Sequence, residues 1–294
     1  MGGYRGNMRS HNIGLLIVAM MAADVANADT LAYVRTSSQQ DLATDRAKYH
    51  PLNLLDDDAG TMWCEGASGM GEGEEIRFVF KKAQKIDRLV IGPAAGTGRL
   101  INVVKVSDGV NSIRIDLSDV YAERTLKNPL EGSNYTVTIQ QVGGPNEGAA
   151  LSNDIACLSE VLMYYKNRLF GGQIPTAKLK YNEYRDKILG RWAGEPLGAP
   201  ESFMVFAIDG TWEWTFTPML GGRSERLSGE YRFRGNRLLM RRGETGRWAD
   251  MGFKHERIEV DPDEIGAPLG DYDVLHLNRA LDAKLKGEYN NAEF

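Results

Sequence analysis

The sequence predicts an all-β protein with two antiparallel domains, a sandwich or barrel followed by a small closed or nearly closed barrel. Short segments rich in β-branched and aromatic residues recur along the chain, and glycine-rich turns separate them. No helical pattern of roughly 10–15 residues lies between them, which excludes a parallel α/β sheet. The length of 294 residues is sufficient for two domains.

Residues 1–28 have the features of a secretory signal peptide. Arg5 and Arg9 give a positive start, the apolar run 13–23 follows, and Ala26-Asn27-Ala28 forms a small-x-small cleavage site. The apolar run is too short for the roughly 20 residues of a membrane-spanning helix. An uncleaved anchor is the alternative. We expect a secreted or periplasmic protein without a transmembrane segment.

Residues 29–166 form the first predicted domain, in which short strand-like segments alternate with glycine-rich turns. The segments with strand length and β-rich composition are 76–80, 86–91, 101–106, 112–117, 135–139 and 155–164. The turns between them lie at 69–73, 92–98, 108–109 and 143–148. This spacing is typical of an antiparallel sandwich or barrel.

Residues 167–182 interrupt the strand pattern and predict an interdomain linker. This segment carries Gly-Gly and Pro and loses the apolar alternation. A short helix is expected over 181–189, so the linker includes its start.

Residues 183–280 form the second predicted domain. Its clearest strand is 211–217, where Trp212, Trp214 and Phe216 share one face. Further strands are expected at 201–209, 230–234, 237–241, 253–260 and 272–277. About 100 residues in six to eight strands suit a small barrel. Residues 281–294 are a predicted C-terminal tail, with a possible helix over 279–288.

The chain has two cysteines, Cys64 and Cys157, which lie 93 residues apart near the two ends of the first domain. An oxidising compartment after export favours a disulfide between them. Two buried free thiols are the alternative. Neither cysteine has a CxxC partner, which argues against a redox role.

The stretch 53–63 concentrates oxygen ligands. Carboxylates at Asp56 and Asp58, with the hydroxyl and carbonyl of Thr61, have a spacing that can wrap a hard cation. Aspartate is also common in loops because of its Asx-turn chemistry, so a solvated acidic turn is the alternative.

Three motifs resemble the discoidin, or coagulation-factor type C, family. They are Asn-Leu-Leu-Asp-x-Asp-x-x-Thr-x-Trp at 53–63, Gly-x-Gly-Glu-x-Ile-x-Phe-x-Phe at 71–80, and Ser-Glu-Val at 159–161. The resemblance covers about residues 40–166 and is greatest to the discoidin-like domain attached to secreted NAD glycohydrolases. It implies a galactose-binding-like jelly-roll β-sandwich.

The resemblance also implies a structural calcium ion. Carried over, its ligands are the side chains of Asp56, Asp58, Thr61 and Glu160 and the carbonyls of Asn53 and Ser159. Pairing Cys64 with Cys157 would bring the two halves of this site together. Asp57 stands where the family often has glycine, which puts the local turn in doubt.

Carbohydrate binding in such sandwiches comes from loops at one end. The candidate residues are Arg99, Asn102, Asn111, Tyr121 and Asn146, which supply planar polar groups for vicinal hydroxyls and one aromatic ring. No tryptophan lies in these loops. Purely structural loops are the alternative.

The second domain resembles a lipocalin-like barrel. Gly190-Arg191-Trp192 directly follows the expected helix, as Gly-x-Trp does at the first strand of such barrels. The resemblance implies that Arg279 stacks on Trp192. Trp212, Trp214 and Phe216 are expected to fill the barrel core rather than to line a ligand cage.

The second domain also carries a dense run of arginines. Eight of its 25 residues between 223 and 247 are arginine, and Glu225, Glu230 and Glu244 reduce the net charge of this segment to +5. A solvated strand face is the favoured interpretation. A cationic surface for anionic glycans, lipids or an acidic partner is the alternative.

The composition and motifs argue against an enzyme and against nucleic-acid binding. Thirty-five basic and 40 acidic residues give a net charge of −5, so the whole chain has no excess positive field. No His-x-x-x-His pair, nucleophile elbow or dinucleotide loop is present. We expect an exported, non-catalytic protein that binds carbohydrate at a cell surface or envelope. The alternatives are a protein-interaction adaptor that assists a toxin-like enzyme, and a hydrolase with an unrecognised carboxylate pair.

Overall fold

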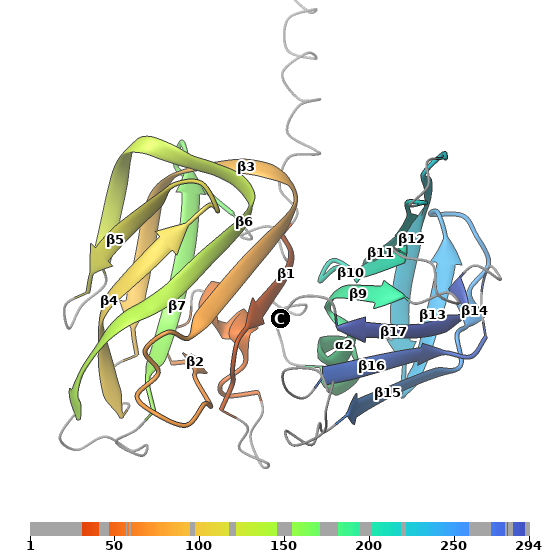
Figure 1. The fold of residues 1–294 in the computed structure, drawn as a ribbon, viewed down its shortest axis with the longest axis horizontal. Coiled ribbons are helices and arrows are strands. Elements are labelled where there is room, and N and C mark those ends of the chain that lie inside the picture. Colours follow the sequence, from red (N-terminus) through yellow and green to blue (C-terminus); the bar gives the residue numbers. More distant parts are fainter. Residues whose placement is uncertain are drawn as a thin grey trace, which may run out of the picture.

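The computed structural model describes residues 31–40, 47–56, 58, 60–94, 98–117, 122–145, 155–170, 182–194, 202–218, 222–258, 272–279, 281 and 285–291. These residues form two all-β domains, as the sequence predicts (Figure 1). The predicted signal peptide and most of the predicted linker lie outside the described residues. Among those described, no helix is long and apolar enough to cross a membrane.

The first domain is a sandwich whose described strands form one hydrogen-bonded network. Its elements are β1 (Leu31–Thr36), η1 (Pro51–Leu55), β2 (Trp63–Cys64), β3 (Glu75–Pro93), β4 (Arg99–Ser107), β5 (Ser112–Asp116), β6 (Ala122–Pro145), β7 (Cys157–Tyr165) and β8 (Arg168–Leu169). The strand order is β2-β7-β3-β6-β4-β5, with β1 paired to β3 and β8 paired to β7.

Two long strands, β3 and β6, join the two layers of the sandwich (Figure 1). The first half of β3 pairs with β1 and with the second half of β6, which also pairs with β4. The second half of β3 pairs with the first half of β6 and with β7. The pairing of β3 with β6 shifts register between Val79 and Gln84, where both strands pass from one layer to the other.

The core of the sandwich lies between these layers. In β3, Ile76, Phe78 and Phe80 are buried while Arg77 and Val79 are less so, which is the alternation expected of a strand with one face inward. The 3-10 helix η1 is buried along its whole length and closes one side of this core.

The second domain begins with helix α2 (Glu183–Ile188), which Asn182 caps through its side-chain oxygen. The strands that follow are β9 (Gly190–Gly194), β10 (Ser202–Phe206), β11 (Thr211–Phe216), β12 (Glu225–Arg234), β13 (Arg237–Arg242), β14 (Ala249–Asp250), β15 (Phe253–Ile258), β16 (Tyr272–Leu277) and β17 (Gly287–Asn291).

These strands form a nearly closed up-and-down barrel. Strands that follow one another in the sequence pair with each other, except that β14 and β15 have no ladder between them. The last strand, β17, also pairs with the first, β9, which almost closes the barrel. Met251 bridges the gap between β14 and β15, because its N–H donates to Leu238 and its carbonyl accepts from Arg279. The barrel prediction is thus confirmed.

The strand β17 corrects the end of the expected helix over 279–288, of which residues 280 and 282–284 lie outside the described residues. Gly287–Asn291 is extended, and Tyr289 is 2% exposed inside the barrel, where its hydroxyl donates to the carbonyl of Leu285. The segment carries one large apolar side chain among polar ones, so its sequence shows no alternation that would predict a strand. The free edge of β9 selects the extended form.

Large side chains fill the barrel interior. Trp192, Trp212 and Trp214 are at most 4% exposed and pack with Met204 and Tyr231 in one cluster, as expected for core residues. The predicted stacking of Arg279 on Trp192 is wrong. Trp192 instead meets the ring of His255 edge-on, with centroids 6.1 Å apart, while the Arg279 side chain lies against Gly252.

The two domains contact each other directly. The N–H of Ile208 donates to the carbonyl of Ala32 at 2.7 Å, and Ala207 and Ile208 belong to the core cluster of the sandwich. Lys81 Nζ lies 2.6 Å from Asp209 Oδ2 and 2.6 Å from Thr211 Oγ1. Strand β1 therefore serves as an edge of the sandwich and as a platform for the barrel.

Candidate functional site

The predicted disulfide joins Cys64 to Cys157. The two cysteines are register partners on the antiparallel strands β2 and β7, with Cα atoms 4.1 Å apart. Tyr49 and Ala94 pack against the bond in a small buried cluster. We call this region, together with the backbone near Arg99, Gly143 and Ala156, the disulfide end of the sandwich.

Arg99 and Asn102 meet at this end, around Gly143. Arg99 Nη1 donates to the carbonyl of Gly143 at 3.1 Å. A Cβ atom on Gly143 would lie 3.1 Å from both terminal atoms of the Asn102 side chain, so glycine allows the amide to approach the backbone closely. Both side chains are half-buried. The structure therefore brings together two of the five predicted ligand residues.

A buried carboxylate that sequence reasoning missed lies beneath this site. Glu65 is 1% exposed, and its Oε1 accepts the N–H of Ala156 at 3.3 Å. Ala156 in turn bridges the backbone of Arg99. Glu65 Oε2 is buried without a hydrogen-bond partner among the described residues. Burial raises the pKa of Glu65. The only sequence feature that could have pointed to Glu65 is its position directly after Cys64.

Gly71 covers Glu65 and illustrates how tightly this region packs. Its φ of 82° lies in the left-handed region, and a Cβ there would be 3.0 Å from Glu65 Cγ. Near this loop, Glu72 Oε1 accepts the N–H of Val142 at 3.1 Å and ties the 71–73 turn to the end of β6.

Asn111 lies at the other end of β4 from Arg99, so the structure does not bring these two predicted ligand residues together. Asn111 belongs to the turn between β4 and β5, where its N–H and side-chain amide donate to the two carboxylate oxygens of Asp108. The nine residues of β4 separate the two ends by roughly 27 Å. Asn111 therefore stabilises a turn. Tyr121 and Asn146 lie outside the described residues.

The acidic loop after η1 is closed by its own hydrogen bonds. Thr61 Oγ1 donates to Asp56 Oδ2 at 2.8 Å and lies 3.0 Å from the carbonyl of Asp58. Asp58 Oδ1 accepts the N–H of Gly60. Burial, and to a smaller extent the nearby charge of Asp58, raise the pKa of Asp56. Two carboxylates with this mutual repulsion favour a cation.

The remaining predicted calcium ligands are Asn53 on η1 and Ser159 and Glu160 on β7. The side chain of Asn53 donates to the carbonyls of Ala47, Lys48 and Met62. Ser159 Oγ donates to Gly92, and Glu160 is 5% exposed on β7. Among the described residues, no three His, Cys, Asp or Glu side chains form a metal-binding group. Calcium also accepts hydroxyl and carbonyl oxygens, so the chemistry of this donor set fits it.

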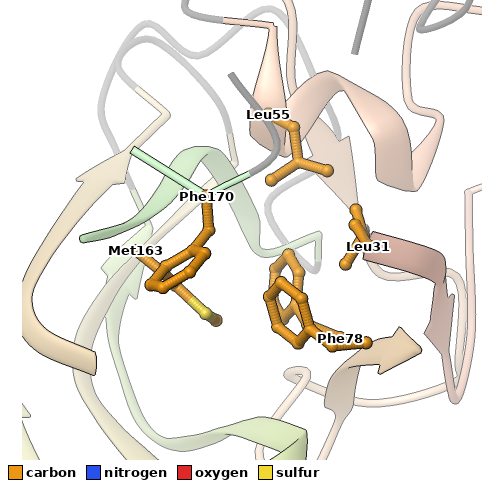
Figure 2. A pocket seen from close by; sticks show the side chains of 6 residues that line it. Leu31, Leu55, Phe78, Met163 and Phe170 are labelled. Carbon is orange, nitrogen blue, oxygen red and sulfur yellow. The ribbon is translucent and has the colours of Figure 1, made fainter. Parts of the chain in front are cut away.

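Two of the hollows in the described part of the sandwich bear on the site. Figure 2 shows the first, where Leu31, Leu55, Phe78, Met163 and Phe170 surround a gap that is too small for a water molecule. It is part of the core. The second is an open groove of about 300 Å³ between β5 and the first half of β6, lined by Ile113, Arg114, Ile115, Arg124, Thr125, Leu126, Lys127 and Asn128. No carboxylate lines either hollow.

Comparisons with known proteins agree with the resemblance inferred from the motifs. Residues 27–164, just under half of the chain, match the family model of the NAD glycohydrolase translocation F5/8 type C domain. No curated protein matches the chain.

Among solved structures, the family 32 CBM from C. perfringens NanJ in complex with galactose is 15% identical, covering 47% of this chain and 99% of that chain at a TM-score of 0.34. The chitosan-binding module 2 from Paenibacillus sp. IK-5 in complex with chitotriose is also 15% identical, covering 47% and 98% at a TM-score of 0.34. The first domain is therefore similar to the F5/8 type C, or discoidin-like, domain of NAD glycohydrolase translocation.

Proposed function

We propose that this is an exported, non-catalytic binding protein whose first domain recognises carbohydrate at a cell surface or envelope. The observation that supports this most is the meeting of Arg99 and Asn102 around Gly143 at one end of the sandwich. A guanidinium fork and a side-chain amide, held on a rigid strand, are suited to the vicinal hydroxyls of a sugar.

Binding is favoured over catalysis by the position of the acidic groups. Glu65 is the carboxylate with a raised pKa nearest this site, but at 1% exposed it is closed to a substrate. Its hydrogen bond to Ala156 holds the backbone that pairs with Arg99, so we assign it a positioning role. The open groove on β5 and β6 carries cations and amides but no general acid.

The site is tested by a matched pair of variants. Asn102→Ala is expected to weaken binding of the recognised glycan by about tenfold, because it removes one amide from the site. Asn111→Ala makes the same change at the far end of β4 and is expected to leave the affinity unchanged. Affinities are measured by calorimetric titration of residues 29–294. Equal losses in both variants would contradict the proposed location.

We also propose that Ca²⁺ binds the acidic loop of Asp56, Asp58 and Thr61. At about 100 times its Kd the ion is expected to stabilise the fold by about 3 kcal/mol and to raise Tm by about 5 °C. Asp58→Asn should abolish most of this shift, whereas Asp116→Asn on the exposed edge strand β5 should preserve it. An identical melting curve in calcium and in chelator would contradict the proposed calcium site.

An adaptor role is the second candidate, and the groove between β5 and β6 favours it. The groove lies beside two strand edges that the described residues leave unpaired, and Arg114, Arg124 and Lys127 line it. An acidic extended segment of a partner could add to such an edge. Pull-down of a partner that Arg124→Glu with Lys127→Glu releases would support this function instead.

A further inference from the structure

The outer face of β12 and β13 is a strongly basic surface. Leu227 and Tyr231 point into the barrel, so the alternating residues Arg226, Arg232 and Arg234 point outward. Figure 1 places β13 and β14 on the side of the barrel that faces away from the sandwich. We call the outward arginines of these two strands, together with Trp248, the arginine face; they are Arg226, Arg232, Arg234, Arg237 and Arg241.

Acidic neighbours neutralise only part of this face. Glu213 pairs with Arg226, Glu230 with Arg241, and Asp250 with Arg237. Within the described residues, no carboxylate pairs with Arg232 or Arg234, which are exposed, nor with the exposed Arg223, Arg242 and Arg247 nearby in the sequence. The chain carries a net charge of −5, so this surplus is a local feature of the barrel.

Trp248 orders the centre of the arginine face. The guanidinium carbon of Arg232 lies 4.1 Å from the centroid of this ring, and that of Arg241 lies 4.9 Å from it. Arg241 also donates two hydrogen bonds to Glu230 Oε2. Stacking restricts the rotamers of both long side chains, so less entropy is lost when an anion binds. Arg232 keeps its donors toward solvent.

We propose that the arginine face binds a linear polysaccharide that carries carboxylate or sulfate groups. Outward residues on a strand repeat every two positions, about 7 Å apart, and β12 and β13 together present rows of guanidinium forks. Each fork can pair with a carboxylate or sulfate through two parallel hydrogen bonds. A linear polymer with repeated anionic groups complements such a row along its length.

Proteins, membranes and nucleic acids are less suitable partners for this face. The large apolar side chains that are exposed among the described residues are Met70 and Val110, both in the sandwich. Trp248 at the centre of the arginine face is half-buried and covered by two guanidinium groups. Among the described residues, the face therefore presents no exposed apolar centre like that of a protein interface and no exposed apolar anchor for a membrane. Its central ring, Trp248, already contacts two guanidinium groups, so it is poorly placed to stack on an unpaired nucleic-acid base.

The test measures binding of residues 29–294 to heparin and to a polyuronate, with uncharged dextran and single-stranded DNA as comparisons. Replacing Arg226, Arg232 and Arg234 together by glutamine is expected to weaken binding of the anionic polysaccharides by about tenfold or more. The control variant replaces Lys82, Lys85 and Lys105 on the sandwich by glutamine, which removes the same charge elsewhere. It should bind as the wild type does.

Two further variants separate this proposal from a general charge effect and from the carbohydrate site of the first domain. Trp248→Leu keeps the net charge and is expected to weaken binding of heparin several-fold, through loss of the ordered arginines. Arg99→Gln is expected to leave heparin binding unchanged. Thermal melts confirm that each variant is folded. Equal weakening by the two triple variants, preference for DNA, or no binding of either polysaccharide would overturn the proposal.

Discussion

Replacing Cys64 and Cys157 together by alanine is expected to lower the free energy of unfolding of the sandwich by about 4–5 kcal/mol. The bond closes a loop with a sequence separation of 93 residues, and opening it restores that chain entropy to the unfolded state. Both cysteines are at most 1% exposed, so alanine avoids the burial of a hydroxyl. The measurement is urea-induced unfolding.

Reduced wild-type protein provides the control for this variant, because it keeps both sulfur atoms in the core. It should lose nearly as much stability as the double variant. The difference between them measures the packing of the sulfur atoms. Thiol titration of the denatured, unreduced protein should find no free thiol. Two free thiols, or an unchanged unfolding midpoint after reduction, would contradict the account.

Acidification is expected to destabilise the protein through His50, at the contact between the two domains. Its Nδ1 accepts the N–H of Leu52, which leaves the proton on Nε2, 3.6 Å from Asp186 Oδ2 on helix α2. Asp186 is already held by Arg185 and by the N–H of Asn182. Burial lowers the pKa of His50 from 6.5 to about 4, although the charge of Asp186 opposes this shift.

The sign of the effect follows from the lowered pKa. Between pH 6.5 and about 4 the unfolded chain binds a proton at His50 that the folded chain does not bind. The free energy of unfolding therefore falls as pH decreases through this window, by up to about 3 kcal/mol. The stability contributed by neutral His50 is fully present above pH 6.5.

His50→Asn isolates this contribution, because its side-chain oxygen can replace Nδ1 as the acceptor for Leu52 but does not titrate. The stability difference between wild type and variant should shrink or reverse as pH decreases from 7 to 4.5. Other groups also have shifted pKa values: burial raises those of Asp56 and Glu65 and lowers that of His255. These groups are present in both proteins, so their contributions cancel in the stability difference. A pH-independent difference would contradict the assignment.

The sequence predicts strands well where one face is buried and the other is exposed. The β11 segment shows this, since its tryptophans alternate with polar residues and are buried as expected. The alternation fails where a strand changes layers. Lys81 to Gln84 interrupt the apolar pattern of β3, which suggests two strands, yet the backbone continues through them. The first half of β6 is missed because much of it lies exposed at a sheet edge.

The candidate site could also be predicted only where the sequence itself carries the information. The pairing of Cys64 with Cys157 could be predicted because the chain offers no other cysteine. The ligand role of Arg99, expected from its place beside a glycine-rich turn, stays a prediction; the structure places the residue at the start of β4. Glu65 was missed because its role depends on contacts with Gly71 and Ala156, which are distant in sequence. Asn111 was grouped with Arg99, from which the structure separates it, because a sequence does not show at which end of a sandwich a turn lies.

The central claim, that the disulfide end of the first domain binds carbohydrate, is tested most directly by a glycan array. Residues 29–294 and the Arg99→Gln variant would be applied in calcium and again in chelator. We predict selective binding of a glycan by the wild type, reduced by chelator and lost in the variant. A blank array with folded protein, or equal binding by Arg99→Gln, would contradict the claim.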